Sequence, residues 1–532
     1  MRRRAFLSGV SLSSLGAASA RAQSALGGSQ PALPTPPNQQ AAKLDDTVGD
    51  GFSRIVIARW GDGVLPGAPP FNPFPLTGAQ ADTQFPYDGV IAGMITPPVA
   101  QDGIPRQVLL VATGDVPARM VFPGGVDNPA VAGREQGVTI LNLQYLGGRW
   151  VTVDGGYQSR RIADGTLCRI SGPVAAAIGT TVQGVLAPQA GCATPWGNAL
   201  LAEGHTGPWL QRLAGVGYGY ADPAQAPRFG WVVELDPLHP LSIPVKRTAL
   251  GRIARAGIAA TQTSDGRPVV FFTQDDPAGF LFRFIAATNA TDGTALDSGT
   301  LAVAQIQGGA INWVELGTDV PSLVGLVGAA AQAGGSAFDA PGGLALSPDG
   351  NALYLACRGN PARTQADALN PRTGDDNGHI IRFAIPGGDL TARSFAGRLV
   401  LVAGNPASAP ATQYGPGSMA WLRQPRTLNL GPQGQLWIGT DQGGDTSQTA
   451  DGLFVMQTGG AVPWMVSAAY LAPKGAAIGG AAFDGATHTI FGMVRHPGAT
   501  PTASFNFPAT RWPTLLPNMP PQSTVIGLVQ QM

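Results

Sequence analysis

The chain has 532 residues, with 33 lysines and arginines against 33 aspartates and glutamates, so its formal net charge at pH 7 is zero. A neutral balance excludes the basic footprint of a nucleic-acid-binding or membrane-surface protein. Charged residues make up only 12% of the chain, whereas there are 74 glycines and 47 prolines. This composition predicts a fold that is dense in turns, rich in short strands and poor in long helices.

The N-terminus, MRRRAFLSGVSLSSLGAASARAQ, carries Arg3-Arg4 before a short apolar run and small-x-small cleavage sites. This pattern is typical of a twin-arginine (Tat) export signal, so we expect residues 1–22 to be removed and the protein to be periplasmic or secreted. The alternative is a disordered basic N-terminus. Residues 23–50 are rich in proline, glutamine and serine and predict a disordered linker. Residues 51–532 are then expected to form a single domain that neither spans nor binds a membrane.

Beyond the linker, short β-rich runs alternate with turn signals, at 106–115, 230–237, 267–276, 343–360, 428–443 and 479–498. The last three runs share the order strand, tight turn, strand, with SPDG, GPQG and FDGA as the turns, which predicts β-hairpins. The best helical candidate is short, at 320–335. Repeated hairpins without helical crossovers favour an all-β fold, a six-bladed β-propeller with long inserted loops. A tandem of β-sandwiches is the competing fold.

Three cysteines, Cys168, Cys192 and Cys357, are widely spaced. An odd number at this spacing predicts neither a disulfide framework nor a zinc motif. We expect buried free thiols, with one disulfide after export as the alternative. Propellers hold ligands where the polar ends of their strands converge at the channel mouth. The polar residues that end the predicted strands are therefore the first candidates for a site: Asp275, Asp276, Asn360, Arg363, Asp441 and His496.

Several unusual segments resemble the PhoX-type bacterial alkaline phosphatases, in the same order and over about 55–515. They include ARWGDGVLPGAPPFNPFPLTGAQADTQFPYDGV (58–90), SRRIADGTLCRISGP (159–173), TPWG (194–197), GWVVELDPLHPLSIPVKRTALGR (230–252) and NPARTQADALNPRTGDDNGHIIRF (360–383). The resemblance implies a Tat-exported six-bladed propeller. It also implies a cluster of calcium and iron ions at the channel mouth that hydrolyses phosphomonoesters.

The family's metal-ligand positions are largely substituted in this chain. Its Asn-His-Glu-Tyr corresponds to 112–115, its cysteine before TPWG to Gln189, and its His-Glu-Gly to 255–257. Its Arg-Pro-Glu-Asp corresponds to 340–343 and its Cys-Glu to 477–478. The positions that the resemblance keeps as metal ligands are Glu203, Asp275, Asp276 and Asp441. Loss of several carboxylates removes the charge that would hold polyvalent cations, so we expect most of the cluster to be missing.

The remaining polar candidates each have two interpretations. Asn360 and Arg363 lie in the best-matched loop, where a guanidinium fork suits phosphate and predicts a catalytic role; a surface salt bridge is the alternative. Aspartates at strand ends also make Asx turns, and Glu203 alternatively makes only local hydrogen bonds. Arg255 and Arg426 occupy former metal-side positions and predict direct anion binding without a metal.

The sequence thus predicts a degenerate phosphatase or an anion-binding propeller, with a phosphate ester or another small anion as its ligand. The alternative is an active phosphomonoesterase with a rebuilt, smaller metal site. A third interpretation is another propeller hydrolase, such as a lactonase with one calcium ion. Three or more carboxylates converging at the channel mouth would favour an enzyme, and a neutral or arginine-lined mouth would favour binding.

Overall fold

The computed structural model describes residues 40–98 and 102–531. The predicted Tat signal, and the predicted linker as far as residue 39, lie outside the described residues. No helix within the described ranges is long and apolar enough to cross a membrane.

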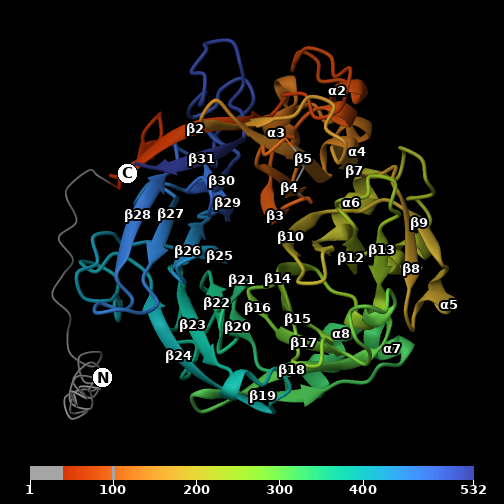
Figure 1. Ribbon diagram of the computed structural model, residues 1–532, viewed down its shortest axis with the longest axis vertical. Coiled ribbons are helices and arrows are strands. Elements are labelled where there is room, and N and C mark those ends of the chain that lie inside the picture. Colours follow the sequence, from red (N-terminus) through yellow and green to blue (C-terminus); the bar gives the residue numbers. More distant parts are fainter. Residues whose placement is uncertain (1–39, 99–101, 532) are drawn as a thin grey trace, which may run out of the picture.

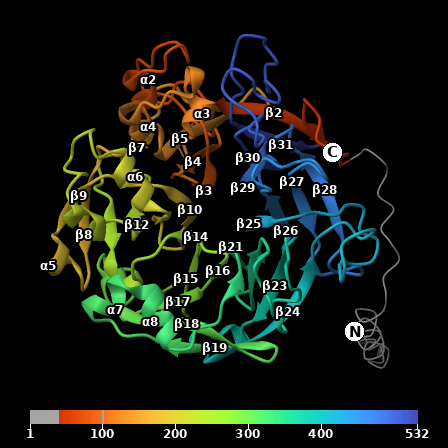
Figure 2. The same ribbon diagram turned by 180° about the vertical axis from the view of Figure 1, so that it is seen from behind.

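Six blades of mainly antiparallel β-sheet surround a central channel, as in a propeller (Figures 1 and 2). Each blade contributes one inner strand to the channel wall, and neighbouring inner strands contact one another around the whole ring. The inner strands are β3 (Val90–Ile95), β10 (Pro188–Ala193), β14 (Arg255–Gln262), β21 (Pro341–Leu346), β25 (Pro425–Leu430) and β29 (Ala477–Asp484). The predicted all-β, six-bladed propeller is therefore confirmed.

The other strands complete each blade outward from its inner strand. In blade I they are β4 (Arg106–Thr113), β5 (Gly137–Leu146), β6 (Arg149–Thr152) and β7 (Arg160–Ile162). In blade II they are β11 (Ala199–Glu203), β12 (Val232–Leu235), β13 (Val245–Arg247), β8 (Leu167–Ser171) and β9 (Thr181–Gln183). In blade III they are β15 (Pro268–Gln274), β17 (Leu281–Ala286), β18 (Gly299–Gln307) and β19 (Ala310–Glu315). In blade IV they are β22 (Ala352–Cys357), β23 (His379–Ala384) and β24 (Ser394–Val402). In blade V they are β26 (Leu436–Thr440), β27 (Gly452–Met456), β28 (Val466–Leu471) and β1 (Thr47–Val48). In blade VI they are β30 (Thr489–Arg495), β31 (Thr524–Gln530) and β2 (Phe52–Arg59).

Helices are short and lie outside the blades. They are α2 (Gly78–Thr83), α3 (Ala118–Val121), α4 (Pro129–Glu135), α5 (Ala175–Ile178), α6 (Thr206–Arg212), α7 (Val320–Val324) and α8 (Leu326–Gln332). The predicted helical segment 320–335 forms the α7–α8 pair, whose start is capped by the Asp319 side chain accepting from the Ser322 N–H. The hairpins predicted around SPDG, GPQG and FDGA are the β21–β22, β25–β26 and β29–β30 pairs.

The ring closes by pairing the two ends of the described chain. Strand β2 lies antiparallel to β31 as the outermost strand of blade VI, with Phe52 opposite Gln530. Residues 40–50 do not behave as the predicted linker, because β1 pairs with β28 and Gln40 bonds to the backbone of Trp421 and Ala450. Within the described ranges, residues before residue 51 therefore already contact the propeller.

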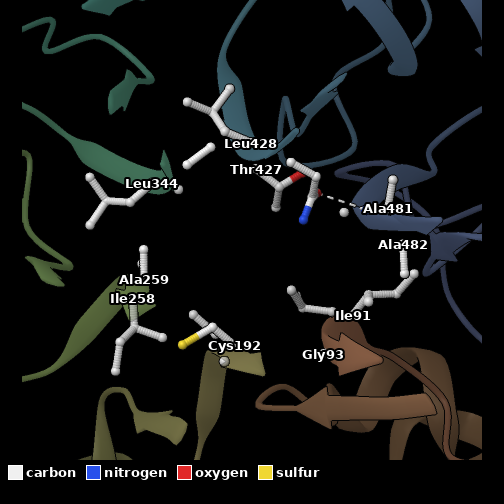
Figure 3. A pocket seen from close by; sticks show the side chains of 18 of the residues that line it. Ile91, Gly93, Cys192, Ile258, Ala259, Leu344, Thr427, Leu428, Ala481 and Ala482 are labelled. Carbon is white, nitrogen blue, oxygen red and sulfur yellow. Dashed lines mark hydrogen bonds between the residues drawn. The ribbon is translucent and has the colours of Figure 1, made fainter. Parts of the chain in front are cut away.

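The channel is lined by the backbone and small side chains of all six inner strands. Figure 3 shows Ile91, Cys192, Ile258, Leu344 and Ala481 around a space of about 380 Å³. The inner strands approach so closely that a Cβ on Gly257 would lie 2.1 Å from the carbonyl oxygen of Gly342. Glycine at position 257 is thus required by the packing of the inner strands around a narrow axis. All three cysteines are free, as expected.

Candidate functional site at the channel mouth

A second cavity, of about 480 Å³, lies at the end of the channel where the inner strands begin. Its wall includes five arginines and three aspartates: Arg119, Arg212, Arg358, Arg426, Arg495, Asp88, Asp115 and Asp441. With histidine neutral, this lining carries two more positive than negative charges. The mouth is therefore polar and net basic, in contrast to the apolar channel behind it.

One charged or ionisable residue from each blade lies at an equivalent position at this end of the propeller, and four of the six line the cavity. Each residue ends, or follows within two residues, the second strand of its blade. In ring order these residues are Asp115, His205, Asp275, Arg358, Asp441 and Arg495, and we call them the mouth ring. Antiparallel strands return to the same end of the propeller after each hairpin, which is why residues far apart in the sequence meet here.

Arg495 is the most heavily bonded member of the mouth ring. Its Nε and Nη2 donate to the two carboxylate oxygens of Asp88 at 3.0 and 2.8 Å, and its Nη1 donates to Asp441 Oδ2 at 2.8 Å. All three side chains are buried. Burial alone would favour neutral Asp441, but the guanidinium groups of Arg495 and Arg426 outweigh it, so the pKa of Asp441 lies below its usual range. These bonds join blades I, V and VI.

Arg358 and Arg426 have donors to spare. Arg426 donates from Nη2 to Gln189 Oε1 at 3.3 Å, and its Nη1 lies 3.4 Å from Asp441 Oδ2. Arg358 Nη2 lies 3.7 Å from Asp275 Oδ1, which is too far for a hydrogen bond. Burial lowers the pKa of Arg426, and the positive charges of Arg358 and Arg495 add to that effect. Two guanidinium groups thus repel each other beside the cavity with N–H groups unused.

His205 and Asp275 pair on the opposite part of the ring, with His205 Nε2 3.4 Å from Asp275 Oδ2. The hydrogen bond to Asp275 raises the pKa of His205. Burial opposes ionisation of Asp275, but His205, Arg426 and Arg358 together lower its pKa to about 2. Asp275 is therefore a carboxylate over the whole neutral range.

Glu203 lies away from the mouth and has no free lone pair for a metal. Its Oε1 accepts from the Leu186 N–H at 2.9 Å and from Lys246 Nζ at 2.7 Å. Its Oε2 accepts from the N–H groups of Gly230 and Trp231 at 2.8 and 3.1 Å. Four donors fill the four acceptor sites of a carboxylate. The prediction that Glu203 binds a metal is corrected accordingly, because the side chain acts as a buried structural anchor.

The other predicted metal ligands divide between the mouth and a turn. Asp275 and Asp441 do lie in the mouth ring, each beside positive charge. Asp276 makes an Asx turn, with its Oδ1 accepting from the Ala278 N–H at 2.9 Å. Neither Asp275 nor Asp276 belongs to the lining of the mouth cavity.

The predicted catalytic pair is also placed outside this cavity. Asn360 Oδ1 accepts from the Ala362 N–H at 3.0 Å, again as a turn residue. Arg363 donates from Nε to Asp339 and from Nη2 to the Ala337 carbonyl at 2.9 Å. Its charge is thus committed within blade IV, the salt bridge that was the alternative for this residue.

Arg255, predicted to hold an anion together with Arg426, does not reach the mouth either. It is fully buried and donates to the carbonyls of Leu250 and Gly230, both at 2.9 Å, and its guanidinium carbon lies 4.6 Å from the centre of the Phe272 ring. Only Arg426 of this pair borders the cavity.

Sequence reasoning missed Asp88, Arg358 and Arg495 as members of the site. The useful signal was present: the mouth residues follow the second strand of each hairpin unit. The pattern at 343–360 predicts a strand that ends at Asn360. In the structure β22 ends at Cys357, so Arg358 is the residue at the mouth.

Six antiparallel blades around a channel with a charged mouth define the class of the protein, a six-bladed β-propeller with a polar site at one end. The chain belongs to the PhoX alkaline phosphatase family: the family model described as alkaline phosphatase PhoX matches residues 35–498. Among solved structures, Pseudomonas fluorescens PhoX in complex with vanadate is 24% identical, with a TM-score of 0.81, over 92% of this chain and 97% of that chain.

A gluconolactonase from Xanthomonas campestris is 12% identical, with a TM-score of 0.32, over 83% of this chain and 96% of that chain. No curated protein matches the sequence.

The calcium and iron cluster implied by the family resemblance does not fit the residues at this mouth. Three of the aspartates, Asp88, Asp275 and Asp441, already face a guanidinium group or an imidazole within 4 Å. Cys192 lines the channel instead of the mouth, and burial raises the pKa of its thiol to about 12. Side chains of arginine and histidine supply here the positive charge that a cation cluster would bring.

Proposed function

We propose that this PhoX-family propeller binds a small oxyanion, such as phosphate or a phosphate monoester, at the channel mouth without the family's metal cluster. We also propose, from the N-terminal twin-arginine pattern alone, that it does so after Tat export. The protein is then a degenerate phosphatase that has kept a ligand-binding mouth.

The observation that carries this proposal is the pair Arg358 and Arg426. Both border the cavity, both retain unused N–H donors, and each lies close enough to the other for their charges to repel. An anion placed between them relieves that repulsion and accepts from the planar forks that suit tetrahedral oxyanions. Arg495 is less suited to this purpose, because each of its three nitrogens already donates to Asp88 or Asp441, which uses three of its five N–H donors.

The shape and charge of the cavity agree with a small ester. A volume of about 480 Å³ lies within the range of small-molecule sites. The net basic lining attracts an anion, while the remaining aspartates disfavour a large polyanion. The similar protein from Pseudomonas fluorescens was solved with vanadate, which is also an oxyanion.

Calorimetric titration with inorganic phosphate tests the proposal. We expect saturable binding in metal-free buffer, and a loss of about tenfold or more in affinity for each of Arg358→Ala and Arg426→Ala, since a charge-assisted bond contributes about 1.5–3 kcal/mol. Arg149→Ala, at an exposed arginine in β6, is the matched control and should bind as the unaltered protein does. Equal affinity in all four proteins would refute the assignment.

The second candidate is an active metal-dependent phosphomonoesterase with a smaller metal site. It is favoured by the three carboxylates that line the mouth cavity, among them Asp115, whose side chain is 62% exposed and lies 4.0 Å from Arg495. Hydrolysis of p-nitrophenyl phosphate with added Ca²⁺ and iron decides between the two. Metal-dependent turnover that disappears in Asp115→Asn would establish this candidate, and phosphate binding without turnover would exclude it.

A further inference from the structure

A separate group of metal-ligating side chains lies inside blade IV. Asp339 is in β20 (Phe338–Asp339), Asp375 is in the loop after β22, and His379 begins β23. One ligand atom from each lies within 4.8 Å of the other two, and all three residues are buried. None of the three belongs to the lining of the mouth cavity.

The bonding capacity of this group is not satisfied within the described part of the chain. Among residues 40–98 and 102–531, no group hydrogen-bonds to either ring nitrogen of His379 or to Asp339 Oδ2. His379 Nδ1 lies 3.9 Å from Asp375 Oδ2, beyond hydrogen-bond distance. His379 and Asp339 are both 0% exposed. Buried polar atoms without partners cost free energy, so they indicate a ligand that completes them.

The outer atoms of the group are held in place. Arg363 Nε donates to Asp339 Oδ1, which leaves Oδ2 free. Arg372 Nη2 lies 2.9 Å from Asp375 Oδ1 and donates to its Oδ2 at 3.1 Å. The Asn377 N–H donates to Oδ1 at 2.9 Å and the Gly378 N–H to Oδ2 at 3.2 Å, so these three donors leave one acceptor site of the carboxylate for an ion. Carboxylates oriented by such outer contacts are typical of metal ligands in proteins.

The donor set points to one kind of ion. Two arginines already balance the two carboxylates, so electrostatic attraction alone would hold a hard cation such as Ca²⁺ poorly. An imidazole nitrogen supplies the additional affinity for borderline transition metals, and calcium prefers oxygen ligands throughout. One histidine and two carboxylates are within the ligand chemistry of zinc.

We propose that Asp339, Asp375 and His379 bind a single divalent transition-metal ion of the zinc class. The ion would join β20, the loop after β22 and the start of β23, and so fix the loop that begins at Arg358. Its role is structural, since the site is buried and separate from the mouth cavity.

Metal analysis of the full chain tests this assignment. The protein is stripped with a chelator, refilled with Zn²⁺ and dialysed, and we expect about one zinc per chain. His379→Ala and Asp339→Asn should bind Zn²⁺ about 100-fold more weakly or worse. His239→Ala, at an exposed histidine, and Asp115→Asn, at the mouth, are the controls and should keep the ion.

A measurement on the unaltered protein covers the case in which the buried variants do not fold. X-ray absorption at the zinc edge should show one imidazole nitrogen and oxygen ligands, with no sulfur. Failure of the unaltered protein to bind Zn²⁺, a spectrum without a histidine, or loss of zinc from Asp115→Asn with retention in His379→Ala would each overturn the proposal.

Discussion

The mouth ring and the blade IV group are built from the same residue types, aspartate, arginine and histidine, but they differ in completeness. At the mouth, every nitrogen of Arg495 donates to Asp88 or Asp441. In blade IV, His379 has no partner for either nitrogen among the described residues. Residue composition therefore does not distinguish a charge network whose groups are hydrogen-bonded to one another from a set of ligand atoms that lack such bonds. A count of the bonded donor and acceptor atoms does distinguish them.

The two regions also differ in how they cross the fold. The mouth ring links different blades, so its arginines contribute to the stability of the closed propeller. The blade IV group lies in one blade, its loop and strand β20, which pairs with β16 (Ala278–Gly279) beside blade III. Removing a residue should consequently weaken the whole protein in the first case, and in the second should matter mainly when the metal is present.

The largest expected effect comes from Arg495→Ala. It leaves buried Asp88 without its cation and Asp441 with Arg426 alone, and breaking such a buried pair typically costs about 3–5 kcal/mol in the free energy of unfolding. Urea denaturation measures this loss, and Arg149→Ala should change stability by less than about 0.5 kcal/mol. A small loss for Arg495→Ala would mean that the mouth ring does not hold the blades together.

A smaller effect of opposite sign is expected for His379→Leu in chelator-treated protein. This change removes two unpartnered buried nitrogens, so stability should be unchanged or rise by about 1 kcal/mol. With Zn²⁺ present, the unaltered protein should instead be the more stable of the two. Thermal denaturation with and without Zn²⁺ compares them, and a variant that is less stable in both conditions would show that His379 is already satisfied.

The smallest effect concerns His205 and its pH dependence. The pKa of His205 is raised, so its stabilising pair with Asp275 is fully present below about pH 6.5 and is lost as the pH rises through the raised value. The contribution of Asp275 is lost only as the pH falls from 3.8 toward about 2.

His205→Gln should therefore destabilise the protein at pH 5.5 and have no effect at pH 9. The side chain is 60% exposed, so the difference should stay below about 1 kcal/mol. Unfolding curves of both proteins at the two pH values measure it. An equal difference at both values would place the role of His205 in packing instead of charge.

Much of the fold could be predicted from local sequence. Tight turns such as SPDG and GPQG mark hairpins, because their residues suit the turn conformations that antiparallel strands need. The part of the site that depended on strand ends, Asp275 and Asp441, was found in the same way.

The remainder depended on contacts that local sequence does not encode. One of the four donors that saturate Glu203 is Lys246, which lies 43 residues further along the chain in β13. Local sequence does not show this contact, so the identity of Glu203 alone favours a metal ligand. Arg363 faces Asp339 and not the mouth, because the loop after β22 turns back toward β20. A residue's neighbours in space, and not its family position, decide whether it can bind a metal.

The pairing of β19 with β24 joins blades III and IV into one nine-stranded sheet, with Ile311 opposite Phe395. Asp275 and Arg358 stand on these two blades, so the spacing between them is set by a continuous hydrogen-bonded plate. Relative motion of the blades should then occur between neighbouring blades whose outer strands are not paired in this way. The part of the mouth formed by blades III and IV would stay fixed, and the residues of the other blades could shift relative to it when an anion enters.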